Sequence, residues 1–225
     1  EKMTWKDQDA SYVIKNDYND MHNVLIAAIK GINEMNEKPS SFYYGDKLNK
    51  KFNQMIRVLV WLILRTQYQL NDDEMNIIFK FFEVMHQQSI NNNIMMVEMC
   101  RLLRVLPRRE LIIQQFDNLI NYIFCSDYDS VYYRTIFIVF IESMKNDIIS
   151  HPECFNKLLS NEGFEKSFSF ACKSKKYVFD NFIQILDEVK PDISSLIKPN
   201  HSLLLKSHTE ILLIALPYAK KINDE

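Results

Sequence analysis

The chain contains only three glycines, Gly31, Gly45 and Gly163, among its 225 residues. Glycine supplies the positive-φ backbone that tight hairpin turns, phosphate-binding loops and dinucleotide-binding folds need. A chain with so few glycines is therefore poorly suited to those architectures. The scarcity favours a fold built from helices.

Apolar residues recur along the chain at helical spacing. Ile77, Ile78, Phe81, Phe82 and Met85 stand at i, i+1, i+4, i+5 and i+8, which places them on one face of a helix. Similar patterns return further along the chain, and no strand pattern competes with them. The spacing predicts helices over residues 8–16, 19–35, 46–69, 72–88, 93–106, 108–124, 128–148, 152–160, 162–172, 175–189 and 201–222.

Two of the predicted helix starts carry capping signals. Asn71 is a candidate N-cap with Glu74 three residues later, and Ser150 is a candidate N-cap with Glu153 three residues later. Both fit the capping box, in which the first side chain accepts from a backbone N–H and the second reaches back to the first residue. We therefore predict helices that begin at residues 72 and 152.

The predicted helices follow one another through short connections, so neighbours are expected to pack as antiparallel hairpins. The hairpins repeat every 35 to 45 residues or so, roughly the period of two-helix repeat units. We expect an all-α fold in which the hairpins stack as an α-solenoid. A compact, irregular helical bundle is the alternative. Because the chain begins without Met, we expect residues 1–225 to form a single helical-repeat domain cut from a longer protein.

The stretch CSDYDSVYYRTIFIVFIESM, residues 125–144, resembles the entry to the second helix of a HEAT or armadillo-type repeat. In that resemblance Asp127 and Asp129 are the acidic turn residues, Val131 is the packing residue and Arg134 is the cation. Arg134 stands three positions after Val131, whereas the family has the cation directly after the valine. The resemblance implies a curved α-solenoid that holds peptides, other proteins or, less often, nucleic acid on one face.

Composition limits the compartment and the partners. The formal net charge is −2, which argues against a globally basic nucleic-acid or membrane binder. The longest apolar runs are much shorter than the roughly 20 residues that span a bilayer, so no membrane partner is expected. The four cysteines show no CxxC pair, so we interpret them as reduced thiols of an intracellular protein, nuclear or cytoplasmic: Cys100, Cys125, Cys154 and Cys172.

The sequence contains no recognisable catalytic or metal-binding motif. The five histidines are scattered, without an HExxH pair, and there is no G-x-S-x-G elbow or phosphate loop. His151 and Cys154 form an H-x-x-C pair, but two ligands make a poor metal site. We therefore expect no catalytic residues, no metal and no cofactor. An enzyme built on a helical bundle would need a closed pocket that one sequence does not display.

Arginines are concentrated in the stretch RLLRVLPRRE, residues 101–110, which holds four of the chain's seven arginines. Arg101 and Arg104 fall in the last turns of a predicted helix, where the helix dipole favours cations. Arg108 and Arg109 follow Pro107 in the first turn of the next helix, where the dipole disfavours them unless an anion lies nearby. That anion is either internal, as carbonyls of the preceding helix or an acid of this or an adjacent hairpin, or external, as a phosphate or carboxylate of a bound segment.

A second candidate surface is KPSSFYYGDKLNKK, residues 38–51. It combines three aromatic residues with lysines, a mixture that can stack on and neutralise nucleic acid. The same aromatic residues can instead fold back onto neighbouring helices. The residues concerned are Phe42, Tyr43, Tyr44, Lys50 and Lys51.

Together these patterns predict a non-catalytic protein-interaction domain, a scaffold or adaptor, that binds a segment of another protein, acidic or phosphorylated. Apolar anchors would give affinity, and Arg101, Arg104, Arg108 and Arg109 would give charge complementarity. The alternative function is a nucleic-acid-binding repeat module that uses the same arginines with Lys50 and Lys51. A steep loss of affinity with salt would distinguish it.

Overall fold

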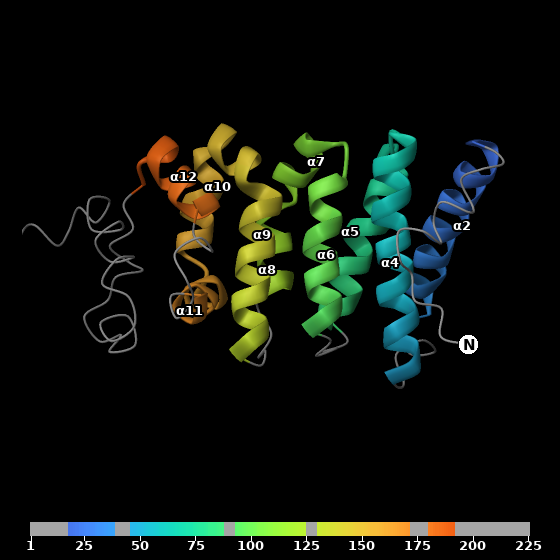
Figure 1. Ribbon diagram of the computed structural model, residues 1–225, viewed down its shortest axis with the longest axis horizontal. Coiled ribbons are helices and arrows are strands. Elements are labelled where there is room, and N and C mark those ends of the chain that lie inside the picture. Colours follow the sequence, from blue (N-terminus) through green and yellow to red (C-terminus); the bar gives the residue numbers. More distant parts are fainter. Residues whose placement is uncertain (1–17, 39–45, 88–92, 125–129, 172–179, 192–225) are drawn as a thin grey trace, which may run out of the picture.

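Ten helices account for most of the part of the chain that the computed structural model describes, residues 18–38, 46–87, 93–124, 130–171 and 180–191 (Figure 1). No strand occurs within these ranges, so the all-α prediction is confirmed for them. The predicted helices at 8–16 and 201–222 lie outside the described residues. The helices are α2 Tyr18–Glu37, α4 Asp46–Thr66, α5 Asp72–Gln87, α6 Asn93–Val105, α7 Arg109–Gln114, α8 Phe116–Phe124, α9 Ser130–Ser150, α10 Pro152–Leu159, α11 Glu162–Ala171 and α12 Asp180–Val189.

The helices form two rows that run along the long axis of the molecule. In Figure 1, α4, α6 and α9 stand side by side at the front, and α5 and α8 lie behind them. The front row is defined by the packing of α4 on α6, α6 on α9 and α9 on α12. The rear row is defined by the packing of α2 on α5, α5 on α8 and α8 on α11. The chain alternates between the two rows as it advances.

Polar contacts between neighbouring helices join residues about 40 positions apart. Within the front row, Arg104 pairs with Glu142 at a separation of 38 residues and Lys145 donates to Gln184 at 39. Elsewhere, Asn36 donates to the Ile77 carbonyl at 41, Lys157 to Asp117 at 40 and Asn161 to Asn121 at 40. A separation of about 40 residues in sequence therefore relates contacting residues on neighbouring helices, in the front row and in the rear row alike.

The core lies between the rows and is rich in phenylalanine. The ring of Phe137 in α9 lies 5.6 Å from that of Phe164, 5.8 Å from that of Phe168 and 5.5 Å from that of Phe182, centroid to centroid. All four side chains are buried. Contacts at these separations are favourable for tilted aromatic rings, so one front-row side chain binds α9 to both α11 and α12.

One of the two predicted capping boxes is present. The backbone N–H of Glu74 donates to Asn71 Oδ1 at 2.9 Å, and the Asn71 N–H donates to Glu74 Oε2 at 2.8 Å. The second is wrong, because α9 continues through Ser150 and His151 occupies the N-cap of α10 without a side-chain capping bond. The α9 helix continues because the His151 N–H donates to the Asp147 carbonyl, which extends the helical bonding past Ser150.

The single helix predicted over residues 108–124 is also wrong, because it is broken at Gln115 into α7 and α8. The two pieces have different anchors. Arg109 at the start of α7 is bound to α6 and α9, whereas α8 packs on α5 and α11. The apolar periodicity continues across the break, so the sequence pattern did not reveal it.

Gly163 marks a close approach between α11 and α8. A Cβ atom added at this position would overlap the carbonyl oxygen of Phe124, a backbone atom that cannot rotate away. Glycine therefore allows α11 to lie against the end of α8.

Candidate functional site

Two arginines from adjacent front-row helices share one buried carboxylate. Arg57 of α4 reaches Glu98 Oε1 with Nε and Nη2, both at 2.8 Å, and Arg101 reaches the same oxygen with Nη1 at 2.7 Å. The Glu98 side chain is only 2% exposed, whereas Arg57 is 58% and Arg101 49% exposed. The carboxylate is thus buried, while both arginine side chains that bind it stay about half exposed.

Arg104 forms a separate and more exposed pair one turn further along α6. Its Nη1 lies 2.6 Å from Oε1 of Glu142 in α9, with side-chain exposures of 60% and 42%. This pair connects α6 to α9 as the Glu98 cluster connects α4 to α6. The outer face of the front row therefore carries charged side chains across three helices.

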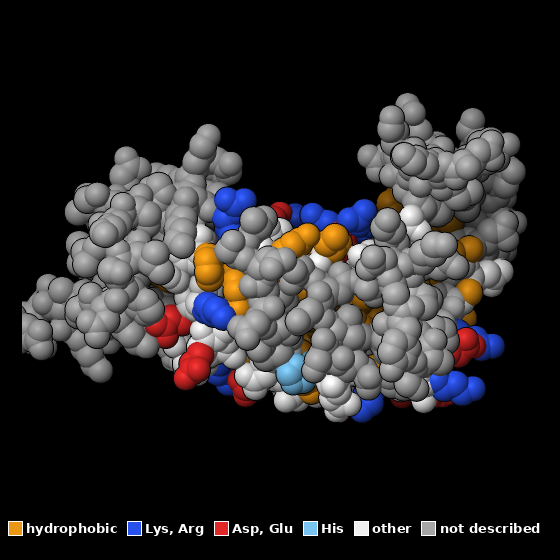
Figure 2. Space-filling view, turned by 90° about the horizontal axis from the view of Figure 1, so that it is seen from below, with side chains coloured by type: hydrophobic (Ala, Val, Ile, Leu, Met, Phe, Trp, Pro, Cys, Tyr) orange, Lys and Arg blue, Asp and Glu red, His pale blue; other side chains and the backbone are white. Residues whose placement is uncertain are grey.

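The same outer face presents apolar side chains. Leu64 lies two helical turns after Arg57 in α4 and is 62% exposed, and Ile94 lies two turns before Arg101 in α6 and is 44% exposed. Figure 2, which views the molecule from below, shows Lys and Arg side chains along its upper edge, the side that faces the viewer in Figure 1. We call this face, over α4, α6 and α9, the arginine surface.

Charge is distributed unequally between the two rows. Helices α4, α6 and α9 contain nine basic and four acidic residues, whereas α2, α5, α8 and α11 contain three basic and ten acidic residues. Within the front row the basic excess ends at α12, which has three acidic residues and no basic one. A chain with a net charge of −2 thus concentrates positive charge over α4, α6 and α9.

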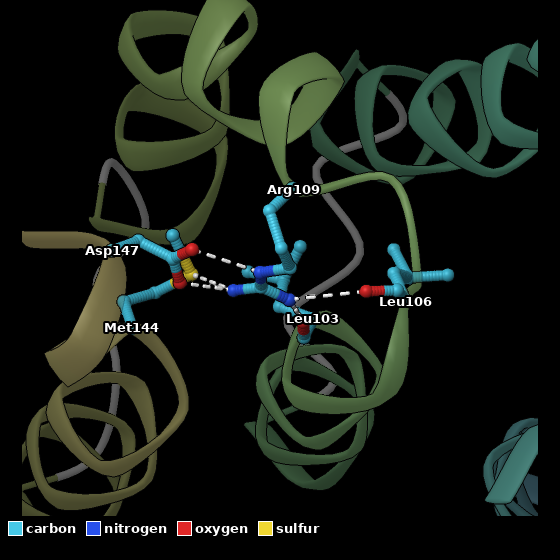
Figure 3. Close-up of polar contacts among 5 residues, drawn as sticks. All are labelled: Leu103, Leu106, Arg109, Met144 and Asp147. Carbon is cyan, nitrogen blue, oxygen red and sulfur yellow. Dashed lines mark hydrogen bonds and ion pairs between the residues drawn. The ribbon is translucent and has the colours of Figure 1, made fainter. Parts of the chain in front are cut away.

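Arg109 lies at a junction of three helices, and its contacts are internal (Figure 3). Its Nε donates to Asp147 Oδ1 at 2.8 Å, and Nη2 pairs with the second carboxylate oxygen. Nη1 donates to the Leu103 and Leu106 carbonyls at the end of α6, and Nη2 also contacts the Met144 sulfur. Asp147 is 10% and Arg109 30% exposed. Of the two anions considered from sequence, the internal one is therefore present at Arg109.

Arg108 also has an internal partner, although a more exposed one. Its Nη2 lies 2.8 Å from Oδ1 of Asp72 at the start of α5, and the two side chains are 43% and 61% exposed. Asp72 belongs to an adjacent hairpin, which is one of the internal partners considered from the sequence. Both arginines after Pro107 thus connect α7 to neighbouring helices.

The remaining residues of the predicted site are only partly described. Phe42, Tyr43 and Tyr44 lie outside the described residues. Lys50 and Lys51 belong to α4, the front-row helix that carries Arg57, and their side chains are not described. Arg134, the cation in the repeat resemblance, is exposed on α9, while Asp127 and Asp129 lie outside the described residues.

Sequence reasoning missed Arg57 and Glu98, which complete the arginine surface. Each lies in a helix that was predicted, but neither stands in a dense cluster of charge. The signal that would have paired them is their separation of 41 residues, close to the separations of the other inter-helix contacts. The period estimated from sequence was too broad to align individual residues.

Reactive thiols, metal ligands, membrane spans and pockets are the other features that could give the described structure a function. Cys100 and Cys154 are free and buried, and burial raises the pKa of both thiols, that of Cys154 to about 11. Within the described ranges, no three His, Cys, Asp or Glu side chains gather in a way that could hold a metal ion. The helices described there are also too short or too polar to cross a membrane. A shallow hollow of about 200 Å³ between α5 and α8 has mostly polar walls, including Lys80, Glu83 and Asn118.

Comparison of the chain with family models, with curated proteins and with solved structures finds no match. The resemblance to HEAT and armadillo-type repeats stays a prediction.

Proposed function

We propose that this chain is a non-catalytic interaction domain, built as a helical-repeat array, that binds an acidic segment of another protein on the arginine surface. The observation that carries the proposal is the row of half-exposed arginines, Arg57, Arg101 and Arg104, on the two neighbouring helices α4 and α6 of an otherwise acidic chain. In this role the domain acts as a scaffold or adaptor.

The regular sequence separation of the inter-helix contacts supports a repeat array. Contacts at 38 to 41 residues occur in both rows, from Asn36 near one end to Gln184 near the other. A stack of two-helix units of about 40 residues produces this regularity, because each unit contacts its neighbours in the same register. The alternative is a compact bundle, for which X-ray scattering would give a radius of gyration near the roughly 17 Å of a compact domain of this length. An array would give a clearly larger value.

The state of the arginines supports an acidic partner. Each guanidinium has five N–H donors, and the contacts with Glu98 and Glu142 use only some of them. Half-exposed arginines of this kind retain donors for a further carboxylate or phosphate, which they bind with a geometry that lysine cannot match. Positive potential over α4, α6 and α9 would also attract an acidic segment before contact.

Apolar contacts would supply the rest of the affinity. Leu64 and Ile94 are large and exposed, and each lies on the same helix as an arginine of the charged cluster. Burying such side chains contributes roughly 25 cal/mol per Å² of apolar surface, and this contribution is insensitive to salt. A partner that combines acidic and apolar side chains therefore fits the surface better than a purely anionic polymer does.

Nucleic acid is the second candidate, and the composition of α4 favours it. This helix carries Lys47, Lys50 and Lys51 in addition to its two arginines. A nucleic-acid ligand would lose affinity steeply as salt rises, because binding releases counterions from the phosphates. A protein segment with apolar anchors would lose much less.

The test is affinity capture from cell extract, with wild type compared with two charge variants. The first variant changes Arg57, Arg101 and Arg104 to Gln. The matched control changes Lys30, Lys80 and Lys157 to Gln, which removes the same charge from α2, α5 and α10. The captured protein is then purified, and its affinity for each form is measured by calorimetry at low and high salt. We expect the first variant to bind at least about tenfold more weakly and the control to bind like wild type.

Equal binding by both variants would contradict the proposed surface. A loss by both to the same extent would show that only net charge matters. Nuclease treatment of the extract separates the two partner classes, because a nuclease-sensitive set of captured proteins points to nucleic acid. Circular dichroism and thermal melting of each variant establish that it folds before its binding is compared.

A further inference from the structure

The cluster of Arg57, Glu98 and Arg101 has an unequal number of charges. One carboxylate faces two guanidinium groups, so one positive charge is not neutralised within the cluster. The Arg104 and Glu142 pair, in contrast, is matched one to one. The excess at the first cluster is on the outer face of the front row, where both arginines are about half exposed.

The geometry of the cluster also brings two like charges together. Three N–H groups, two from Arg57 and one from Arg101, converge on the single oxygen Oε1 of Glu98. Two guanidinium groups bound to one oxygen are necessarily neighbours, and without the carboxylate they would repel each other. The Glu98 side chain is 2% exposed and belongs to the same helix as Arg101. Its carboxylate therefore holds both guanidinium groups at one position.

Both guanidinium groups keep N–H donors that an external anion could use. Arg57 uses Nε and Nη2, which leaves Nη1, and Arg101 uses Nη1, which leaves Nε and Nη2. Among the described residues, these remaining nitrogens have no partner. A carboxylate or phosphoryl group has several acceptor oxygens and can take bonds from both guanidinium groups at once.

We propose that Arg57 and Arg101 form a socket for one oxyanion of the partner segment, a carboxylate or a phosphoryl group, and that Glu98 is the positioning residue that holds the two guanidinium groups together. This inference rests on the proposed function and names the place on the arginine surface where the anionic group binds. Preorganisation is the source of the affinity, because the free protein has already brought the two cations together.

Replacing Glu98 distinguishes a positioning role from a simple effect of its charge. Removing a negative charge near an anion site ordinarily strengthens anion binding, because the local potential becomes more positive. If Glu98 positions the arginines, Glu98→Gln has the opposite effect, because the two cations separate. Glu142→Gln is the matched control, since it removes one charge from the same face without releasing Arg57 or Arg101 from each other.

The experiment titrates inorganic phosphate and, separately, acetate into the isotope-labelled chain and follows the arginine Nε–H signals by NMR. We expect saturable shifts of Arg57 and Arg101 in wild type. Glu98→Gln should weaken phosphate binding about fivefold or more, whereas Glu142→Gln should leave it unchanged or slightly tighter. Two synthetic peptides that differ only in phosphoserine or glutamate at one position then distinguish the two sources of the anion.

Two outcomes would overturn the socket: no saturable shift in wild type, or a Glu98→Gln variant that binds phosphate as tightly as Glu142→Gln. If Glu98→Gln does not fold, Arg57→Lys replaces it, because lysine keeps the charge but loses the planar fork. That variant should lose about fivefold in affinity, while Arg65→Lys, an exposed control on the same helix, should not. Loss of partner binding in the triple arginine variant together with a failed socket test would leave the proposed function standing and remove only the socket.

Discussion

Arg101 and Arg109 belong to the same short stretch of sequence, yet the fold gives them different surroundings. Arg101 lies on the outer face of α6, 49% exposed, with one oxygen of Glu98 as its partner. Arg109 lies where α6, α7 and α9 meet, 30% exposed, and its guanidinium contacts a carboxylate, two carbonyls and a sulfur. Arg109, with four partners within the protein, stabilises the fold. Arg101 keeps N–H donors without a partner among the described residues, so it is available to a ligand.

Removing an arginine should have different consequences at the two places. At the junction of α6, α7 and α9, removal of Arg109 leaves Asp147 nearly buried and without its main partner. On the outer face, Glu142 is 42% exposed, so water can solvate its carboxylate when Arg104 is removed. Loss of Arg109 should therefore appear as lost stability, and loss of Arg104 as lost binding.

The largest expected effect is that of Arg109→Ala. Leaving one member of a mostly buried ion pair without its partner costs about 3 kcal/mol or more in the free energy of unfolding. Urea denaturation followed by circular dichroism measures this loss. The double variant Arg109→Met with Asp147→Leu should recover much of it, because neither charge is then buried alone. A single variant as stable as wild type would show that the junction does not depend on this pair.

A matched pair of glycine substitutions tests whether packing between helices is equally tight along the molecule. Gly163→Ala drives a methyl group into the Phe124 backbone and should destabilise the fold by about 1 to 3 kcal/mol. Gly31→Ala in α2 places its methyl group 3.9 Å from the Met55 sulfur and should stabilise by about 0.5 to 1 kcal/mol. The two melting temperatures should move in opposite directions. Equal shifts would mean that the approach of α11 to α8 is looser than described.

The Cys154 thiol provides a separate test through pH, because burial shifts its pKa. Burial raises the thiol pKa from 9.0 to about 11, so between these values the unfolded chain binds fewer protons than the folded chain. Stability is therefore retained below pH 9 and lost as pH rises towards 11, by about 1 kcal/mol per pH unit. Denaturation curves for Cys154→Ala should decline less steeply over this window than those of wild type. Identical slopes would exclude a contribution from this thiol.

The smallest effect on stability is expected from Arg104→Ala. Its ion pair with Glu142 is exposed on both sides, and such pairs contribute less than about 1 kcal/mol. The difference from wild type should shrink further in high salt, which screens exposed charges. Arg108→Ala, which breaks another exposed pair, provides the comparison. A loss as large as that of Arg109→Ala would contradict the division between junction and outer face.

The helices were predictable because the signals that form them are local. The apolar period placed α5 and α6 to within a residue or two, and the Asn71 and Glu74 box marked the start of α5 correctly. Each of these signals depends on atoms within a few residues of one another. The continuous helix over 108–124 was wrong where contacts with distant helices hold α7 and α8 separately. The Ser150 box was wrong because α9 continues its helical hydrogen bonding to His151.

The sequence by itself determined that the chain is helical and that its arginines cluster near residue 105. It also indicated that Arg108 and Arg109 need an anionic partner, without showing whether that partner belongs to the chain or to a ligand. Only the tertiary structure decided that Asp72 and Asp147 are those partners and that Arg57 joins Arg101 on Glu98. Most of these pairs lie some 40 residues apart, so each depends on the register in which one helix packs against the next. The spacing of apolar residues within one helix does not determine that register.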